Sequence, residues 1–191
     1  MAPERVDERD EVDRIVGAWQ RERPDLDVSP LQVLSRVSRL ARHLDLARRA
    51  AFAEHGLETW EFDVLSALRR AGAPYQLSPG RLVTQTLVTS GTMTNRIDRL
   101  EQRGLLARSP DPSDRRGVLV RLTAAGQAQV DAAMADLLER ERALLEHLDD
   151  RARERLAAAL RTLVSPFDSG GSAGSGTAAG AGSGRDETTV P

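Results

Sequence analysis

The stretch "TSGTMTNRIDRLEQRGLLARSPDPSDRRGVLVRLT", residues Thr89–Thr123, decides the fold of this chain. Met93, Ile97 and Leu100 recur at three- and four-residue intervals, which predicts a helix with one apolar seam. Thr89 is a good N-cap for that helix, and Gly104 is suited to its end. Two apolar runs, "LLARS" and "VLVRLT", follow as strands joined by "PDPSDRRG", a connection rich in turn-forming residues. The stretch therefore predicts a helix followed by a hairpin.

A second, shorter helix is predicted just before it, in "PGRLVTQTLV" from Pro79. Two helices separated by a break of three to four residues are typical of a helix-turn-helix, in which the second is the recognition helix. Helical spacing also predicts helices over residues 7–22, 31–54, 60–71, 124–148 and 150–164. Thr59, Thr123 and Asp149 precede the last three as caps, and "YQLS" reads as a short extended segment. The predicted fold class is mainly α (α+β): a winged helix-turn-helix with long N- and C-terminal dimerisation helices and a small two- to three-stranded wing.

Three regions differ in composition and in predicted role. Residues 1–30 form an N-terminal extension with one extra helix, and residues 31–167 form the winged-helix DNA-binding and dimerisation domain. Residues 168–191 are mostly Gly, Ser and Ala, which predicts a disordered tail. The long helices carry more apolar surface than one small domain can cover, so we expect a homodimer.

The composition excludes several classes of chemistry. The chain has no cysteine, which excludes disulfides and Cys-ligated zinc, and its three histidines, His43, His55 and His147, have no metal-ligand spacing. No nucleophile motif or phosphate-binding loop is present, so we expect no enzyme activity, cofactor or metal. The first residues are charged and no long apolar run follows, which favours a soluble, cytoplasmic protein without a membrane partner.

The charge distribution points to double-stranded DNA although the formal net charge is -2. Residues 81–121 carry eight arginines against four acidic residues, so this block is locally basic. One turn of about 100° per residue places a small, polar face opposite the apolar seam, suited to a major groove. The DNA-contacting residues predicted on that helix are Ser90, Gly91, Thr92, Thr94, Asn95 and Arg99. The alternative is an ordinary solvated helix face.

The hairpin carries a second group of charged residues, Asp114, Arg115 and Arg116. Arginine favours the negative potential of a narrow minor groove, so we expect Arg115 and Arg116 to contact phosphate or that groove. Asp114 would hold the hairpin tip by pairing with an arginine backbone or side chain. The alternative is a solvated turn whose charges serve solubility.

These two segments, Ser90–Glu101 and Asp111–Gly126 ("DPSDRRGVLVRLTAAG"), resemble the MarR family of transcription factors, which are winged-helix homodimers. The resemblance covers residues 31–164 and includes the family's Asp-x-Arg wing as Asp114 and Arg116. It implies that Arg116 enters the minor groove and that Asp114 orients it.

A narrower resemblance is to the urate-responsive PecS and HucR-type branch of that family. It rests on an added N-terminal helix and on Trp19, Asp63, Arg96 and Arg108, which it implies as ligand-binding residues. Helical geometry turns Arg96 toward the protein body, where we expect Asp63 to be paired. An anion bound there would compete for the arginines and shift the recognition helix or wing. Alternatively, Trp19 anchors its helix, Asp63 favours a helix dipole, and Arg108 contacts phosphate.

The leading hypothesis is a ligand-responsive transcriptional repressor that binds a pseudo-palindromic operator as a homodimer. A small anionic effector such as urate, another purine or a phenolic anion would release it. Alternatives are a MarR-type regulator of other effectors, an effector-independent architectural DNA-binding protein, and an enzyme or purely helical interaction module.

Overall fold

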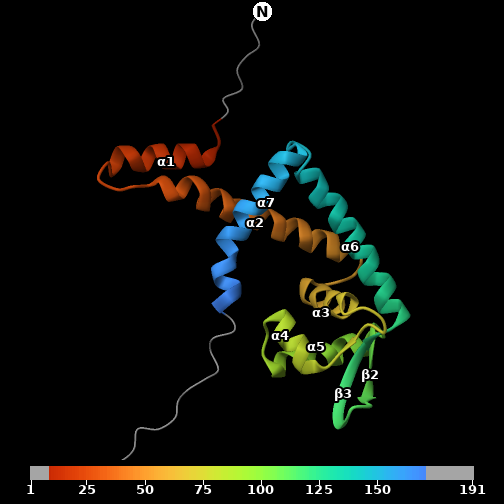
Figure 1. Cartoon of the computed structure of the whole chain (residues 1–191). Helices are drawn as coiled ribbons and strands as arrows, with labels where there is room; N and C mark the ends of the chain where they lie inside the picture. The colour runs from red at the N-terminus through yellow and green to blue at the C-terminus, as the bar shows by residue number, and fades with distance from the viewer. Residues whose placement is uncertain (1–8, 171–191) are drawn as a thin grey trace, which may run out of the picture. The chain divides into compact units, whose positions relative to one another are not determined.

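The computed structural model describes residues 9–170, which contain seven helices and three short strands (Figure 1). This confirms the predicted fold class of a mainly helical winged helix-turn-helix with a small antiparallel sheet. The elements in chain order are α1 (Glu11–Glu22), α2 (Ser29–Glu54), α3 (Thr59–Arg70), β1 (Gln76–Leu77), α4 (Pro79–Thr86), α5 (Ser90–Gln102), β2 (Leu106–Asp111), β3 (Asp114–Leu122), α6 (Ala124–Leu144) and α7 (Asp150–Gly170).

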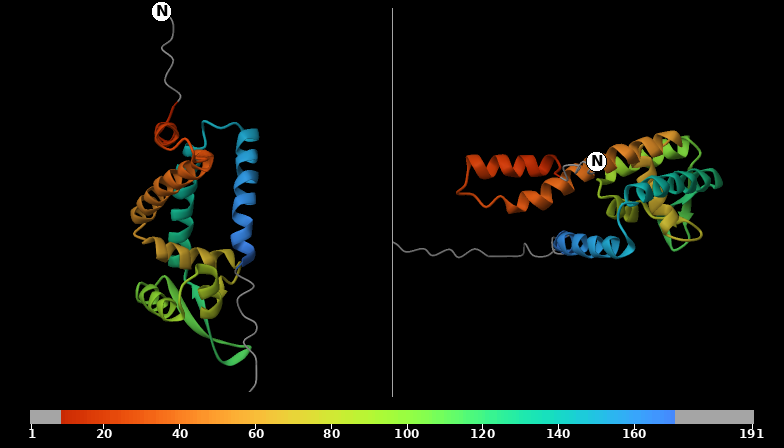
Figure 2. Two further views of the ribbon diagram at one scale, coloured as in Figure 1. Left: turned by 90° about the vertical axis from the view of Figure 1, so that its left-hand side faces the viewer. Right: turned by 90° about the horizontal axis from the view of Figure 1, so that it is seen from above.

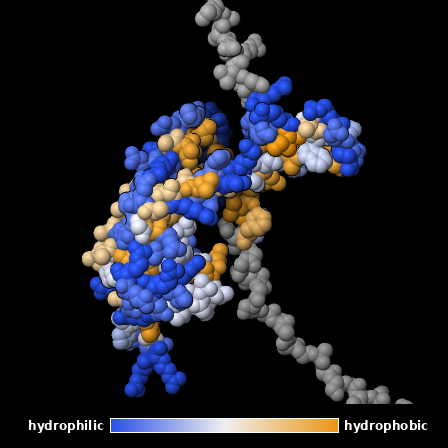
Figure 3. All heavy atoms as spheres, turned by 180° about the vertical axis from the view of Figure 1, so that it is seen from behind, coloured by the Kyte–Doolittle hydropathy of each residue, from blue (hydrophilic) through white to orange (hydrophobic). Residues whose placement is uncertain are grey.

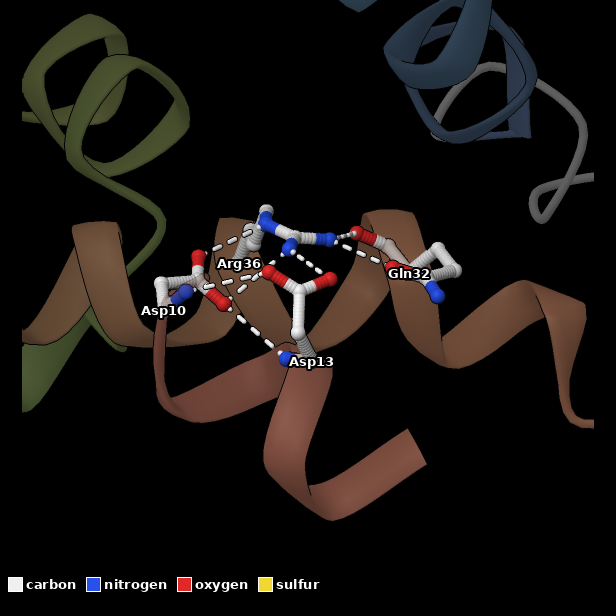
Figure 4. Close-up of polar contacts among 4 residues, drawn as sticks. All are labelled: Asp10, Asp13, Gln32 and Arg36. Carbon is white, nitrogen blue, oxygen red and sulfur yellow. Dashed lines mark hydrogen bonds and ion pairs between the residues drawn. The ribbon is translucent and has the colours of Figure 1, made fainter. Parts of the chain in front are cut away.

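The extra N-terminal helix, α1, packs along the first part of α2 (Figures 1 and 2). Val12 and Val16 are buried there against Val28. Arg36 of α2 donates from Nε to Asp10 at 2.8 Å and forms an ion pair with Asp13 at 2.9 Å (Figure 4). A small apolar cluster and one bidentate arginine therefore hold α1 to α2.

The main core lies where α3, α5 and the sheet meet the end of α2 and the middle of α6. Met93, Ile97 and Leu100 are buried, so the predicted apolar seam of α5 faces this core. Phe52 of α2 stacks on Phe62 of α3 with ring centroids 4.0 Å apart. Burial of this kind contributes roughly 25 cal/mol per Å² of apolar surface removed from water, which fixes α5 on the body.

The wing is longer and tighter than the sequence predicts. The sheet order is β1-β3-β2, and β2 pairs with β3 from Leu106↔Leu122 to Asp111↔Asp114. Only Pro112 and Ser113 remain in the turn, so the expected eight-residue connection is wrong and Arg115 and Arg116 belong to a paired strand. A register irregularity between Pro110 and Asp111 allows this pairing to continue to the tip.

Several helix ends agree with the sequence. Thr89 caps α5, Thr123 Oγ1 accepts from the Gly126 N–H at 3.0 Å, and Asp149 accepts from the Ala152 N–H at 2.7 Å. Gly104 has φ +69°, the left-handed conformation that ends α5.

Other helix ends differ from the prediction, including the start of α2, which is Ser29 instead of Leu31. The N-cap of α3 is Glu58 instead of Thr59. Helix α6 ends at Leu144, four residues early, and α7 continues past Val164 to Gly170. Residues 171–191, most of the expected disordered tail, lie outside the described residues, as do residues 1–8.

The chain divides into two units, residues 1–143 and residues 144–191. In the second unit α7 leaves Leu156, Leu160 and Leu163 exposed. Among the described residues, no helix is both long and apolar enough to cross a membrane. The same part of the chain holds no cluster of His, Cys, Asp or Glu side chains that would bind a metal ion.

Candidate functional site

Helix α5 presents the predicted polar face to solvent. Thr89 Oγ1 accepts from the Thr92 N–H at 3.3 Å, which orients the first turn, and Thr94 Oγ1 donates to the Ser90 carbonyl at 3.1 Å. Among the residues expected as DNA contacts, Ser90, Gly91, Thr92, Thr94 and Asn95 are exposed. No side chain lies within 4 Å of a methyl group placed on Gly91, so a ligand backbone has room to approach this turn.

Arg99, the arginine expected to read a base, lies against α3 instead of pointing freely outward. Its Nη2 donates to Glu58 Oε1 at 3.1 Å, and its guanidinium lies 4.7 Å from the centroid of the Trp60 ring. Cation–π contacts at this distance are attractive and directional. In this structure Arg99 is therefore held between a carboxylate and an indole.

The wing tip is organised by Asp114, whose Oδ1 accepts from the Arg116 N–H at 2.9 Å. A Cβ on Gly117 would lie 2.9 Å from Asp111 Cβ, so the tight tip requires glycine there. Within the described residues, the side chains of Arg115 and Arg116 are exposed and make no hydrogen bond or ion pair. Figure 3 shows hydrophilic side chains at the end of the wing, whereas hydrophobic ones are exposed over the helices.

Arg108 lies at the base of the wing, as predicted, but its partners are on the recognition helix. Its guanidinium pairs with both Asp98 and Glu101, and its N–H donates to Glu101 Oε1 at 3.1 Å. These contacts fasten β2 to α5. They also offset part of the negative charge of two acidic side chains on a helix that is expected to approach phosphates.

Asp63 and Arg96 line one cavity of about 550 Å³ beside α3 and α5. Trp60 and Arg49 also line it. Asp63 further lines a second cavity of about 530 Å³, whose walls include Phe52, Phe62, Arg48 and Arg70. The first cavity combines two carboxylates, Glu58 and Asp63, with two arginines, and the second combines three arginines with four carboxylates and apolar side chains. Mixed walls of this kind can hold a small polar ligand with an apolar ring.

The expectation that Asp63 is paired is wrong for this structure. Its carboxylate makes no hydrogen bond or ion pair among the described residues. Burial raises the pKa of Asp63, and the charges of Arg96, Arg70 and Arg48 only partly oppose this effect. Arg48 is already paired with Glu141 and Arg70 donates to Ser66, whereas Arg96 makes no hydrogen bond or ion pair among the described residues, so Arg96 is the cation beside Asp63 that is open to another anion.

The four residues of the narrower resemblance do not meet in one chain. Asp63 and Arg96 share a cavity, whereas Trp19 lies on α1 beside Ile15 and Ala18 with 48% of its surface exposed. Arg108 lies with Asp98 and Glu101 and lines neither cavity. The expected four-residue site is therefore incomplete within one copy of the chain.

Two features were missed in the sequence. Trp60 stands three residues before Asp63, a spacing that places both on one face of α3, and this spacing is the signal that would have found it. Glu61 is the one buried charged residue of the described chain; its Oε2 accepts from Arg103 Nη1 at 2.6 Å and from the Glu58 N–H at 2.9 Å. No local pattern marks that pair, because 42 positions separate its members.

Comparison with known proteins identifies the family. The model of the MarR family matches residues 55–117, from the end of α2 into the wing. The HTH-type transcriptional regulator PecS of Dickeya dadantii is 41% identical over 150 residues, which cover 78% of this chain and 90% of PecS. The chain belongs to the MarR family of transcriptional regulators. Within it, the chain matches the PecS-type branch, as the narrower resemblance predicts.

Solved structures of MarR-family proteins have the same fold. BpsR of Bordetella bronchiseptica is 32% identical with a TM-score of 0.52, covering 67% of this chain and 98% of BpsR. MarR of E. coli is 26% identical with a TM-score of 0.53, covering 66% of this chain and 95% of that protein. These proteins are transcriptional regulators, which are not enzymes. This MarR-family chain is a DNA-binding transcriptional regulator, and its relatives support one that responds to a ligand.

Proposed function

We propose that this MarR-family regulator is a repressor that binds a pseudo-palindromic operator as a homodimer and is released by a small anion such as urate. The observation that carries the proposal is the position of Arg96. This residue belongs to the recognition helix and also lines the cavity that contains Asp63. Any anion that binds Arg96 there acts directly on the helix expected to enter the major groove.

The DNA contacts proposed are the exposed face of α5 and the wing. Ser90, Gly91 and Thr92 open the helix at its positive end, where a phosphate is favoured. Asn95 lies on the exposed face, where it can pair with an adenine edge. Arg116 projects from β3 with its backbone fixed by Asp114, which suits insertion into a minor groove. We assign Arg115 to phosphate.

The homodimer proposed here would cover apolar surface that one copy leaves exposed. On α2, the exposed residues are Val33, Leu34, Val37, Leu40 and Leu46, and on α6 they are Met134 and Leu138. In the second unit, Leu156, Leu160, Leu163, Val164 and Phe167 are exposed as well. A symmetric dimer would give two recognition helices for two operator half-sites.

We accordingly assign residues 31–167 to DNA binding and dimerisation, and residues 1–30 to an extension that carries α1. A regulator of this kind works where the chromosome lies, so we propose that the protein acts in the cytoplasm.

The effector proposed is a planar anion. Arginines line both cavities beside Asp63, and Arg96 is the one that makes no hydrogen bond or ion pair among the described residues. The other walls include the carboxylates Asp45, Glu58, Asp131 and Glu141 and apolar side chains such as Phe52 and Phe62. The structural relative BpsR has its DNA binding regulated by 6-hydroxynicotinic acid, an anionic heterocycle. Urate shares that chemistry, and a second copy of the chain would be the source of the Trp19 and Arg108 that one cavity lacks.

The first experiment measures binding of the full-length protein to the DNA upstream of its own gene. Affinity should fall steeply with salt, because arginines that neutralise phosphates release counterions. Arg116→Ala should weaken binding by roughly tenfold or more, the equivalent of 1–3 kcal/mol for a groove-inserted arginine. Arg121→Ala removes the same charge from the other end of β3 and should change affinity much less. Equal affinities for the wild type and both variants would show that the wing does not contact the DNA.

The second experiment tests the effector with urate, 6-hydroxynicotinate and salicylate, each with and without operator DNA. The active anion should raise the melting temperature of the wild type and release its DNA. Arg96→Gln should abolish both effects. A protein that binds its operator but ignores all three anions would support the effector-independent architectural protein instead.

A further inference from the structure

Trp60 separates two hollows of the molecule. On one side lies the cavity that contains Asp63, and on the other a shallow depression formed by Gly91, Thr92, Asn95 and Arg99 on the exposed face of α5. Trp60 and Arg96 line both of them. The indole therefore stands between the site proposed for the effector and the surface proposed for DNA.

Two arginines of α5 lie over this one indole ring. The guanidinium of Arg96 lies 5.5 Å from the ring centroid of Trp60, and that of Arg99 lies 4.7 Å from it. Since they stand three residues apart on one helix, these like charges also repel each other. Each arginine therefore weakens the cation–π contact between Trp60 and the other arginine.

Arg99 is held by a further contact that Arg96 lacks. The Trp60 Nε1–H donates to Glu58 Oε2 at 2.7 Å, and Arg99 Nη2 donates to Glu58 Oε1 at 3.1 Å. Trp60, Glu58 and Arg99 thus form a closed cluster, which we call the Arg99 clamp. Arg96 makes no hydrogen bond or ion pair among the described residues, so it is the arginine available to an anion in the cavity.

We propose that Trp60 is a positioning residue that couples the effector cavity to Arg99, an inference that rests on the proposed function. An anion bound to Arg96 neutralises the charge that repels Arg99, and the clamp then holds Arg99 more tightly against α3. In that position Arg99 is withdrawn from the base edges that it would reach in the major groove. Without the anion, repulsion from Arg96 favours opening of the clamp, and Arg99 turns to the DNA.

The test is a thermodynamic cycle on the full-length protein, with operator affinity measured by fluorescence anisotropy in the presence and absence of urate. For the wild type we expect urate to weaken DNA binding within the range of about 5- to 150-fold that is typical of coupled sites. In Trp60→Ala the ratio should fall to ~1, because the cluster that holds Arg99 is gone. Its affinity for DNA without urate should equal or exceed that of the wild type, whereas a merely structural role would lower it.

Two further variants keep the test valid if Trp60→Ala folds poorly. Trp60→Phe keeps an aromatic face but loses the N–H that holds Glu58, so we expect a ratio between those of the wild type and Trp60→Ala. Glu58→Gln removes the carboxylate charge and should reduce the ratio while the indole remains. Circular dichroism and urate titration by calorimetry, done on each variant, establish that fold and effector binding persist.

The outcomes distinguish this inference from the function on which it rests. If urate releases the wild type and all three variants by the same factor, the coupling through Trp60 is overturned and the repressor function stands. If operator binding by the wild type does not respond to urate, 6-hydroxynicotinate or salicylate, the proposed function fails and the coupling fails with it.

Discussion

Gly126 is expected to tolerate no side chain at all. It is buried in the first turn of α6, and a Cβ placed there would lie 1.9 Å from the Leu105 carbonyl oxygen and 2.9 Å from its carbon. To reach an ordinary C···O contact of about 3.3 Å, α6 would have to move by roughly 1.4 Å away from the corner between α5 and β2. The obstacle is backbone, so no change of rotamer relieves it.

The cost of Gly126→Ala follows from these contacts. Overpacking of this kind costs about 1–3 kcal/mol, and a rigid backbone obstacle places it near the upper limit. Moving Leu105 also strains the 3.2 Å hydrogen bond that the Thr123 N–H donates to the Leu105 carbonyl, and this strain adds about 1 kcal/mol to the loss of stability. At roughly 2–4 °C per kcal/mol for a chain of this size, the loss of about 3–4 kcal/mol lowers the melting temperature by roughly 6–16 °C.

Thermal unfolding followed by circular dichroism, at one fixed protein concentration, measures this loss. The matched control is Gly80→Ala on α4, where no atom lies within 4 Å of the added Cβ. Alanine is favoured over glycine in a helix by roughly 0.5–1 kcal/mol, so the control should melt slightly above the wild type. If Gly126→Ala melts with the wild type, the packing of α6 on the corner is not as described.

Three further predictions concern ion pairs and one carboxylate. Arg103→Ala leaves the Glu61 carboxylate buried without its cation. Because Arg103 is itself partly exposed, we expect the free energy of unfolding in urea to fall by about 3 kcal/mol, the lower end of the usual loss. Arg14→Ala, which breaks an exposed pair with Glu11, should change that free energy little, and equal losses for the two variants would contradict the burial argument. Burial raises the pKa of Asp63, so the folded chain keeps this proton at pH values where the unfolded chain has lost it, and stability falls as pH rises above the ordinary value. Asp63→Asn should therefore melt above the wild type at neutral pH and level with it in acid; a difference independent of pH would refute this reading. Arg36→Ala removes the arginine held by Asp10 and Asp13, so hydrogen exchange should accelerate in α1 while α5 keeps its protection. If hydrogen exchange in α1 does not change, the buried valines are sufficient to hold this helix to α2.

The helix starts show where local sequence is sufficient. Thr89, Thr123 and Asp149 were predictable as caps because a short oxygen-bearing side chain satisfies the free N–H groups of the first turn. Glu58 was not, since glutamate ranks low at this position. Here Glu58 and Glu61 are N-cap and N3 of α3, and the Glu58 N–H donates to Glu61 Oε2. A local rule therefore placed this boundary one residue too late.

The wing and the cavity show where local sequence is insufficient. Each residue of "PDPSDRRG" favours a turn, but cross-strand pairing as far as Asp111↔Asp114 outweighs that preference. Asp63 and Arg96 were predictable as neighbours from helical geometry and the family resemblance. The Arg99 clamp was not, because it joins α3 to residues 39 positions later, and only the packed fold brings them together.

The short turn at Pro112 and Ser113 makes the wing a lever. Between Leu122, at the start of the hairpin's base, and Asp114, near its tip, a strand spans about 26 Å at roughly 3.3 Å per residue. A tilt of ~5° at the base would carry the tip through ~2 Å, the difference between a made and a broken hydrogen bond. β3 leads directly through Thr123 into α6, a helix with exposed apolar residues. A small rotation of α6 would thus produce a larger displacement at Arg116. A flexible eight-residue loop would not transmit that rotation.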